Sequence, residues 1–347
     1  GLSDVFLRNQ KINRYKVRYI MNFTPCEKSG AYEGFALVKS CDKKSAKNGT
    51  FYLDMVLGDK DGEIYAKMWD YREETTHLPQ VNTVVKVRGL LQQYNGNDQF
   101  IVQRIRPAVA EDNISMTDFV KSADCEGDVM LEAIYETVNA FSDEDIKKVV
   151  LGMLQDNKEQ ILTFPAAEKL HHAMMGGLLY HTLSMLKLAQ CVSSIYPCID
   201  KDLLYSGVIL HDIAKMREYT LNDAGVIDGH TVEGVLLGHL VMGAEDIGRK
   251  CDELGIPSEK KYLLQHMIAS HHGKPEFGAA VRPGFIEAEV LSQIDLLDAN
   301  MYEMADAVKD VKPGEFTGRL WMLDNRRLYN HGRVDVKPQA NLIDEGE

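Results

Sequence analysis

The sequence predicts two domains of different class, a small all-β domain followed by a larger all-α domain. Three observations support this. The chain has 347 residues, a length that suits two domains. Polar and apolar residues alternate up to about residue 107, as they do in strands. From about residue 128 the apolar residues recur at the spacing of helices.

The N-terminal part contains six alternating runs, at residues 15–21, 34–39, 50–57, 63–69, 83–89 and 99–103. Turn residues separate several of them, for example Gly58–Gly62 and Asn95–Asn97. About five short strands with hairpin signals in roughly 90 residues are typical of a small barrel or sandwich.

The character of the chain changes after Pro107. We expect an N-terminal arm at residues 1–14, the strand domain at 15–107 and a polar, turn-rich linker at 108–127. A helical domain is expected at 128–333, followed by a loose tail at 334–347. The first helices are expected at 129–138, 143–154 and 158–163, and helical spacing continues to about residue 307.

Charge is distributed unevenly between these parts. The net charge is −13, yet residues 1–107 hold 17 Lys+Arg and 12 Asp+Glu (+5), and the remaining residues hold 22 and 40 (−18). A basic N-terminal domain indicates a polyanionic partner, and an acidic body would need cations to meet it. No run reaches the ~18 apolar residues of a membrane helix. The six cysteines form no C-x-x-C pair, which favours reduced thiols in a cytoplasmic protein.

Histidine is concentrated in the helical part. Nine of the 11 histidines lie between His171 and His272. A lone histidine on an apolar helix is usually a satisfied core residue, but here four segments each place one among apolar residues, and a fifth places Asp295 there. Adjacent His211 and Asp212 suit Mn²⁺, Fe²⁺, Zn²⁺ or Mg²⁺ between helices. Lys215, one turn beyond His211, would hold a phosphate oxygen near the metal.

The order H…HD…D resembles the signature of the HD-domain metal-dependent phosphohydrolases. The resemblance assigns His181, His211, Asp212 and Asp295 to that motif, and His239, His271 and His272 to its longer, two-metal form. Residues 176–185 and 270–278, together with the preceding strand domain, are similar to the YhaM family of 3′-to-5′ exoribonucleases. The resemblance implies a multi-domain protein in which a small all-β OB-fold barrel precedes an all-α HD-domain helical bundle. One position departs from the family pattern. In the family, the residue before the first motif histidine is usually acidic, and in this chain it is Tyr180.

The activity implied by this resemblance is that of a metal-dependent phosphodiesterase that releases 5′ mononucleotides from the 3′ end of single-stranded RNA, with single-stranded DNA as a further substrate. Asp212 and Lys215 are the expected catalytic residues. We expect two divalent ions per chain, with Mn²⁺ as first choice and Fe²⁺, Mg²⁺, Co²⁺ or Zn²⁺ as alternatives. No membrane partner is expected, and a homo-oligomer stays open.

Substrate contacts are expected in both domains. His172 and His230 are candidates in the helical domain, although capping roles would also explain them. In the strand domain, Lys43, Lys44 and Lys47 are expected in a polar loop, where the simplest explanation is solvation. Exposed aromatic residues that would stack with bases are predicted to be Tyr65, Trp69 and Tyr94.

Two alternatives remain from the sequence. The first is a nucleotidase or dNTP hydrolase of the HD class, which would not need a domain that grips a strand. The second is a non-enzymatic nucleic-acid-binding protein with a vestigial HD domain, which the complete set of expected ligands disfavours.

Overall fold

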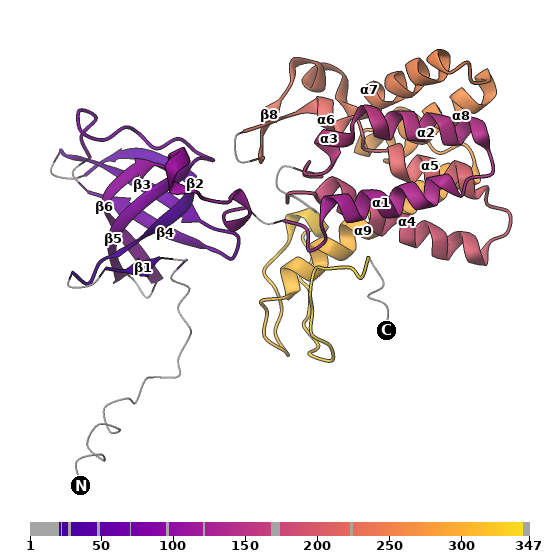
Figure 1. The fold of residues 1–347 in the computed structure, drawn as a ribbon. Coiled ribbons are helices and arrows are strands. Elements are labelled where there is room, and N and C mark those ends of the chain that lie inside the picture. The colour runs from indigo at the N-terminus through magenta and orange to yellow at the C-terminus, as the bar shows by residue number, and fades with distance from the viewer. Residues whose placement is uncertain are drawn as a thin grey trace, which may run out of the picture. The chain divides into compact units, whose positions relative to one another are not determined.

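The computed structural model describes residues 21–342 except 22, 27, 28, 47, 48, 70, 95, 96, 121, 168–173, 223 and 224. The chain divides into two compact units between Phe119 and Val120, inside the segment expected to be a linker (Figure 1). The expected arm at 1–14 and nearly all of the expected strand at 15–21 lie outside the described residues.

The N-terminal unit is a closed barrel. Its strands are β1 (Thr24–Pro25), β2 (Tyr32–Ser45), β3 (Phe51–Gly58), β4 (Glu63–Met68), β5 (Val84–Tyr94) and β6 (Asn97–Pro107). They lie in the order β1-β2-β3-β4-β6-β5, and β5 pairs with β2 to close the sheet. Only β4 and β6 are parallel among these pairs. Five strands closed in this order form the Greek-key barrel of an OB-fold, so the fold predicted for this unit is confirmed.

The barrel encloses its own apolar core. Alternate residues of each strand point inward, as the period of two requires. On β2 these are Ala36 and Val38, and on β3 they are Leu53, Met55 and Leu57. Phe100 of β6 is also buried in this core. The outward-facing residues of the same strands are therefore available for ligands.

The C-terminal unit is a helical bundle. Its helices are α1 (Gly127–Asn139), α2 (Glu144–Asp156), α3 (Lys158–Ile161), α4 (Gly177–Ile195), α5 (Lys201–Leu210), α6 (Lys215–Glu218), α7 (Val232–Glu253), α8 (Ser258–Ser270) and α9 (Ile286–Val308). One short hairpin, β7 (Tyr219–Leu221) with β8 (Ile227–His230), interrupts them. Within the described residues, no helix combines the length and apolar character that crossing a bilayer requires.

Helices α4 and α5 form the centre of this bundle. Residues 178–186 of α4 are buried without interruption, which explains why its apolar residues cover every face. Helix α5 starts at Asp200, whose side chain accepts a hydrogen bond from the Leu203 amide. His181 lies in the first turns of α4, and His211 and Asp212 directly follow α5, so the packing of these two helices fixes the positions of the three side chains.

The end of the described chain belongs to the bundle. Leu342 is buried in the same core as α4 and α5. The Ala340 amide donates a 2.5 Å hydrogen bond to the Tyr180 hydroxyl. The expectation of a loose tail beyond residue 333 is therefore wrong for these residues, because a single apolar side chain and one backbone hydrogen bond are too little to recognise in a sequence.

Candidate metal centre and nucleic-acid face

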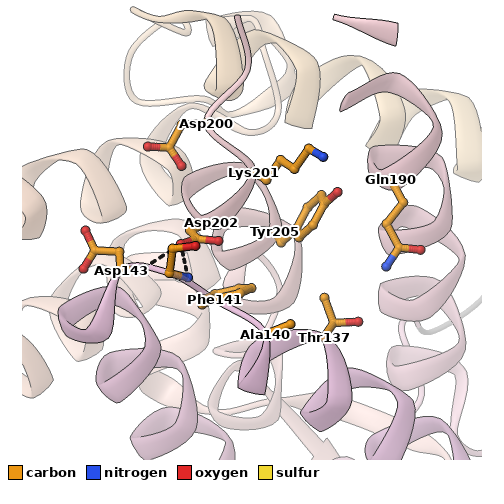
Figure 2. A pocket seen from close by; sticks show the side chains of 10 residues that line it. Thr137, Ala140, Phe141, Asp143, Gln190, Asp200, Lys201, Asp202 and Tyr205 are labelled. Carbon is orange, nitrogen blue, oxygen red and sulfur yellow. Dashed lines mark hydrogen bonds between the residues drawn. The ribbon is translucent and has the colours of Figure 1, made fainter. Parts of the chain in front are cut away.

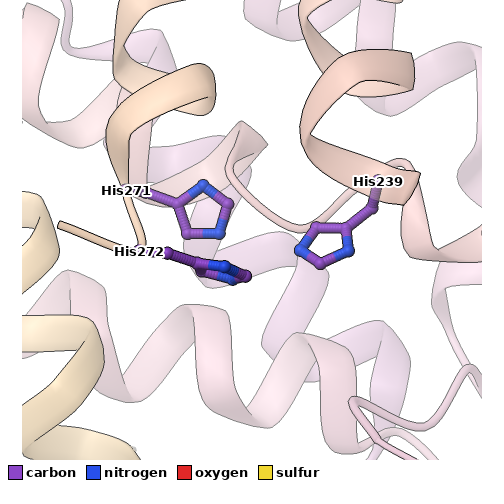
Figure 3. Close-up of side chains that lie close together, drawn as sticks. All are labelled: His239, His271 and His272. Atoms are coloured by element: carbon purple, nitrogen blue, oxygen red, sulfur yellow. The ribbon is translucent and has the colours of Figure 1, made fainter. Parts of the chain in front are cut away.

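Seven predicted metal ligands converge at one place in the helical unit. They come from five segments, namely α4 (His181), the turn after α5 (His211 and Asp212), α7 (His239), the end of α8 (His271 and His272) and α9 (Asp295). Three overlapping groups of them have ligand atoms within 4.8 Å of one another. Figure 3 shows the rings of His239, His271 and His272 facing a common space.

Asp212 lies between two histidine groups. Its Oδ2 atom is 3.2 Å from His211 Nε2, and its Oδ1 atom is 3.4 Å from His239 Nε2. His271 Nε2 lies 3.8 Å from the same Oδ1 atom. Each carboxylate oxygen of Asp212 therefore faces a different set of imidazoles.

The five histidines are held by the nitrogen that faces away from this space. Nδ1 of His211, His271 and His272 donates to a backbone carbonyl, at 2.8, 2.7 and 2.9 Å. Nδ1 of His181 and His239 bonds to a carboxylate, in each case at 2.7 Å. A donor role for Nδ1 leaves a lone pair on Nε2, so the acceptors select the tautomer that binds a metal.

The polar atoms of this centre match the needs of divalent cations. Nε2 of His211, His239 and His271 and Oδ1 of Asp212 are buried and have no hydrogen-bond partner among the described residues. Burying such atoms without a partner costs about 1–3 kcal/mol each. Imidazole and carboxylate ligands suit Mn²⁺, Fe²⁺, Co²⁺ and Zn²⁺, and these side chains fit divalent metal binding.

The electrostatic environment keeps Asp212 ionised and His271 neutral, which are the forms that bind a metal. Burial alone would raise the pKa of Asp212, but Lys215 and His211 outweigh it and hold that pKa well below its usual range. Burial, reinforced by His211, holds the pKa of His271 well below its usual range, so this imidazole is neutral. Burial also acts on His181, but hydrogen bonds to Asp295 and Asp298 raise its pKa to about 10. The carboxylates around His181 therefore favour a positive charge there.

Lys215 supports Asp212 directly. Its Nζ atom lies 2.7 Å from Asp212 Oδ2 and donates a 3.0 Å hydrogen bond to the Ala166 carbonyl. Burial would lower the pKa of Lys215, yet Asp212 raises it, so the ammonium is protonated. Lys215, Asp212 and Asp295 also line an adjacent cavity of about 800 Å³, called the metal-side cavity below.

A glycine sets the position of His239. Gly238 has φ 71° and ψ 160°, and helix α7 is kinked there. This backbone region is essentially restricted to glycine. The kink turns the chain immediately before His239, whose ring then reaches both Asp212 and Glu218.

Two carboxylates that support the ligands were not assigned a role from the sequence. Glu218, the last residue of α6, accepts from His239, and Asp298 of α9 accepts from His181 and Ser184. A weak signal existed for Asp298, which follows Asp295 by three residues and so shares its helix face. The Tyr180 hydroxyl, at the position where an acid was expected, donates a 3.3 Å hydrogen bond to the Ala340 carbonyl.

A second cavity of the helical unit, of about 780 Å³, has acidic lining but no cluster of ligands. Its carboxylates already serve the backbone. Asp202 accepts 2.7 Å hydrogen bonds from the Ser142 and Asp143 amides (Figure 2). Asp143 caps α2 and Asp200 caps α5. The carboxylates that line this cavity are therefore explained by their hydrogen bonds to backbone amides.

The barrel presents the three predicted aromatic residues to solvent. The exposed fractions are 65% for Tyr65, 46% for Trp69 and 65% for Tyr94. Tyr65 and Trp69 follow the outer face of β4, where the Trp69 ring lies 4.8 Å from the ring of Tyr52. Lys67, between them on the same face, lies 5.4 Å from the Trp69 ring. Aromatic rings beside a cation are the elements of a surface for single strands.

The lysines are placed differently from the expectation. Lys43 and Lys44 lie on β2, which pairs with β3 as far as Ser45, so the expected loop is wrong for these two residues. They form exposed ion pairs with Glu73 and Asp54, both at 2.6 Å. Lys47 and His172 lie outside the described residues. His230 ends β8 with its ring 4.7 Å from that of Tyr219 and is not among the described residues lining the metal-side cavity.

Comparison with known proteins places this arrangement in a family. A family model described as HD domain matches residues 178–300, a span that includes the site from His181 to Asp298. A second model, TraI_2, matches residues 121–198. The 3′-5′ exoribonuclease YhaM of Bacillus licheniformis is 41% identical over 297 residues, which cover 85% of this chain and 93% of that protein. The chain belongs to the YhaM family.

Other members of the YhaM family match over the same extent. YhaM of Bacillus subtilis is 39% identical over 85% of this chain and 93% of its own length, and YhaM of Listeria monocytogenes serotype 4b (strain CLIP80459) is 38% identical over 85% and 94%. The SSB domain of a Synechococcus protein aligns at 17% identity with a TM-score of 0.21, over 22% of this chain and 93% of that chain. The predicted family is confirmed by the curated relatives.

Proposed function

We propose that this protein is a metal-dependent 3′-5′ exoribonuclease that removes 5′ mononucleotides from single-stranded RNA. The observation that carries the proposal is the placement of Asp212 between two groups of histidines, each held with its Nε2 atom toward the shared space. Membership of the YhaM family, whose relatives are named 3′-5′ exoribonucleases, supports the choice of substrate and direction.

The metal ligands divide into two sets around Asp212. His181, His211 and Asp295 would hold one ion on the Oδ2 side, and His239, His271 and His272 would hold the other on the Oδ1 side. Two divalent ions at such a site would activate a water molecule and neutralise charge on the phosphoryl oxygens. Mn²⁺ suits the mixture of imidazole and carboxylate ligands.

The chain's own groups orient the reactants. Hydrolysis adds the oxygen of water to phosphorus, breaks the bond to the 3′ oxygen of the preceding nucleotide and leaves a proton on that oxygen. Lys215, protonated and facing the cavity, would donate to a phosphoryl oxygen and stabilise its developing charge. In this proposal Asp212 and Lys215 are the catalytic residues, and the ion pair between them supports their joint role.

The barrel would bind the RNA strand upstream of the bond that is cut. Tyr65 and Trp69 lie on the β3–β4 face, and Tyr94 is the last residue of β5, next to the connection to β6. OB-folds bind oligonucleotides on this face and at this loop. A nucleotidase that acts on free dNTPs gains nothing from such a surface, which favours the nuclease.

A time course on RNA carrying a label at either end tests the proposal. With Mn²⁺ present, 5′-labelled RNA should shorten one nucleotide at a time, and 3′-labelled RNA should release labelled mononucleotide from the first time point. Faster hydrolysis of free dNTPs than of RNA would instead identify a nucleotidase. Absence of hydrolysis with every divalent ion, despite RNA binding, would indicate a binding protein.

A further inference from the structure

The metal-side cavity contains an aromatic ring that the metal chemistry does not use. The cavity of about 800 Å³ is lined by Asp212, Lys215 and Asp295 and also by the segment between α8 and α9. Its volume lies within the ~300–1,000 Å³ usual for small-molecule sites. Phe277, from that segment, is 63% exposed although it lies in the same cavity as deeply buried ligands.

The backbone of this segment is fixed and joined to the metal site. His272 Nδ1 donates a 2.9 Å hydrogen bond to the Phe277 carbonyl. Further along, the Gly284 amide donates a 2.8 Å hydrogen bond to His266 Nε2. The Ala280 amide donates at 3.0 Å to the Ala269 carbonyl at the end of α8. The Phe277 ring is therefore presented from a braced loop, at a position set by a metal ligand.

Positive charge accompanies the ring. Lys274 Nζ lies 5.9 Å from the centroid of the Phe277 ring, and Arg282 lines the same cavity. An exposed ring with cations beside it is the combination by which proteins hold single-stranded nucleic acid, since the ring stacks on a base and the cations face phosphates. Among the described residues no other aromatic ring lies against the Phe277 ring, whereas the exposed Trp69 ring of the barrel lies 4.8 Å from the ring of Tyr52.

We propose that Phe277 is the stacking platform for the base of the 3′-terminal nucleotide, and that Lys274 and Arg282 contact the adjoining phosphates. This rests on the proposed exoribonuclease activity and adds how the end of the strand is held. A ring face stacks on any base and reads no hydrogen-bonding edge, so all four 3′-terminal bases are accepted. A nucleotide without a base loses the contact.

Phe277→Leu removes the aromatic face and leaves the backbone carbonyl that His272 uses. The matched control is Phe316→Leu, because Phe316 is also exposed (53%), has a cation (Arg327, 5.1 Å) over its ring and lies outside the cavity. With the full-length protein and a short RNA, Phe277→Leu should raise KM about 5- to 150-fold, as expected for loss of one base–aromatic stack. Phe277→Trp should retain binding, and Phe316→Leu should match the wild type.

The substrate supplies the second variable. A short RNA with an abasic 3′-terminal residue should bind the wild-type protein and Phe277→Leu equally. With a short RNA whose last linkage cannot be hydrolysed, and with the metal ions retained, 2-aminopurine at the 3′ end should be quenched by the wild type and not by Phe277→Leu. An unchanged KM in Phe277→Leu, or an equal loss for base-bearing and abasic ends, would overturn the proposal. If the wild type quenches 2-aminopurine but never shortens RNA, the exoribonuclease proposal fails while the stacking site stands.

Discussion

Glu218 offers the sharpest test of the metal centre, because it touches only one of the two ligand sets. Its Oε2 atom accepts a 2.7 Å hydrogen bond from His239 Nδ1, and both side chains are buried. Glu218→Gln keeps the size and an acceptor oxygen but removes the charge. A hydrogen bond to a charged group contributes about 1.5–3 kcal/mol and a neutral one about 0.5–1.5. Replacing the charged acceptor by a neutral one therefore weakens the hydrogen bond to His239 by about 1–1.5 kcal/mol. This corresponds to roughly tenfold weaker binding of one ion, at the low end of the 10–100-fold effect expected when a hydrogen-bond partner of a metal ligand is changed.

The assay is calorimetric titration of the metal-free protein with Mn²⁺, together with metal content after dialysis. Glu218→Gln should weaken one of two binding steps. Glu287→Gln is the matched control, since Glu287 is also buried and accepts one 2.7 Å hydrogen bond, from the Asp200 amide, away from the metal ligands. Wild-type affinity at both steps in Glu218→Gln, or the same weakening in Glu287→Gln, would refute the role given to Glu218.

Three further predictions concern single side chains. Asp212→Asn should abolish hydrolysis and lower metal content, and turnover near the wild-type rate would contradict the metal mechanism. The same substitution should destabilise the fold by about 3–5 kcal/mol, because Lys215 loses its buried partner. Gly238→Ala should cost about 1–3 kcal/mol, since φ 71° with ψ 160° is strained for alanine; an unchanged melting temperature would contradict this. Trp69→Ala should weaken binding of single-stranded RNA by about 1–3 kcal/mol, measured by anisotropy, with Trp321→Ala as control because Trp321 is also exposed but belongs to the helical unit. Equal affinities of these two variants would argue against the barrel face.

The convergence of the candidate ligands could be predicted because each is an ionisable side chain in an otherwise apolar helical segment. His181 and Asp295 are ionisable residues in apolar helical segments, and such positions are rarely filled without a function. The strands were predictable from alternation alone, and the exposure of Tyr65 and Trp69 followed from the same period of two.

The residues that hold the ligands were less predictable. His181 and Asp298 are 117 positions apart, and Glu218 is 21 positions from His239. These pairs exist only once the helices are packed, and an acidic residue on a helix usually faces solvent. Gly238 is similar, because a single glycine in a helical pattern does not reveal that its φ is positive.

The charge distribution links the two units in function. A polyanion is repelled by a body that carries −18 outside the first 107 residues, so its end can approach only where cations offset the carboxylates. The helical unit supplies such a place, since Lys215, Lys274 and Arg282 line the cavity beside the metal ligands. The barrel, at the basic end of the chain, is proposed to bind RNA through its aromatic faces, whose stacking on bases salt does not screen. Removal of the metal ions should therefore weaken capture of the RNA 3′ end as well as stop hydrolysis, while binding to the barrel persists.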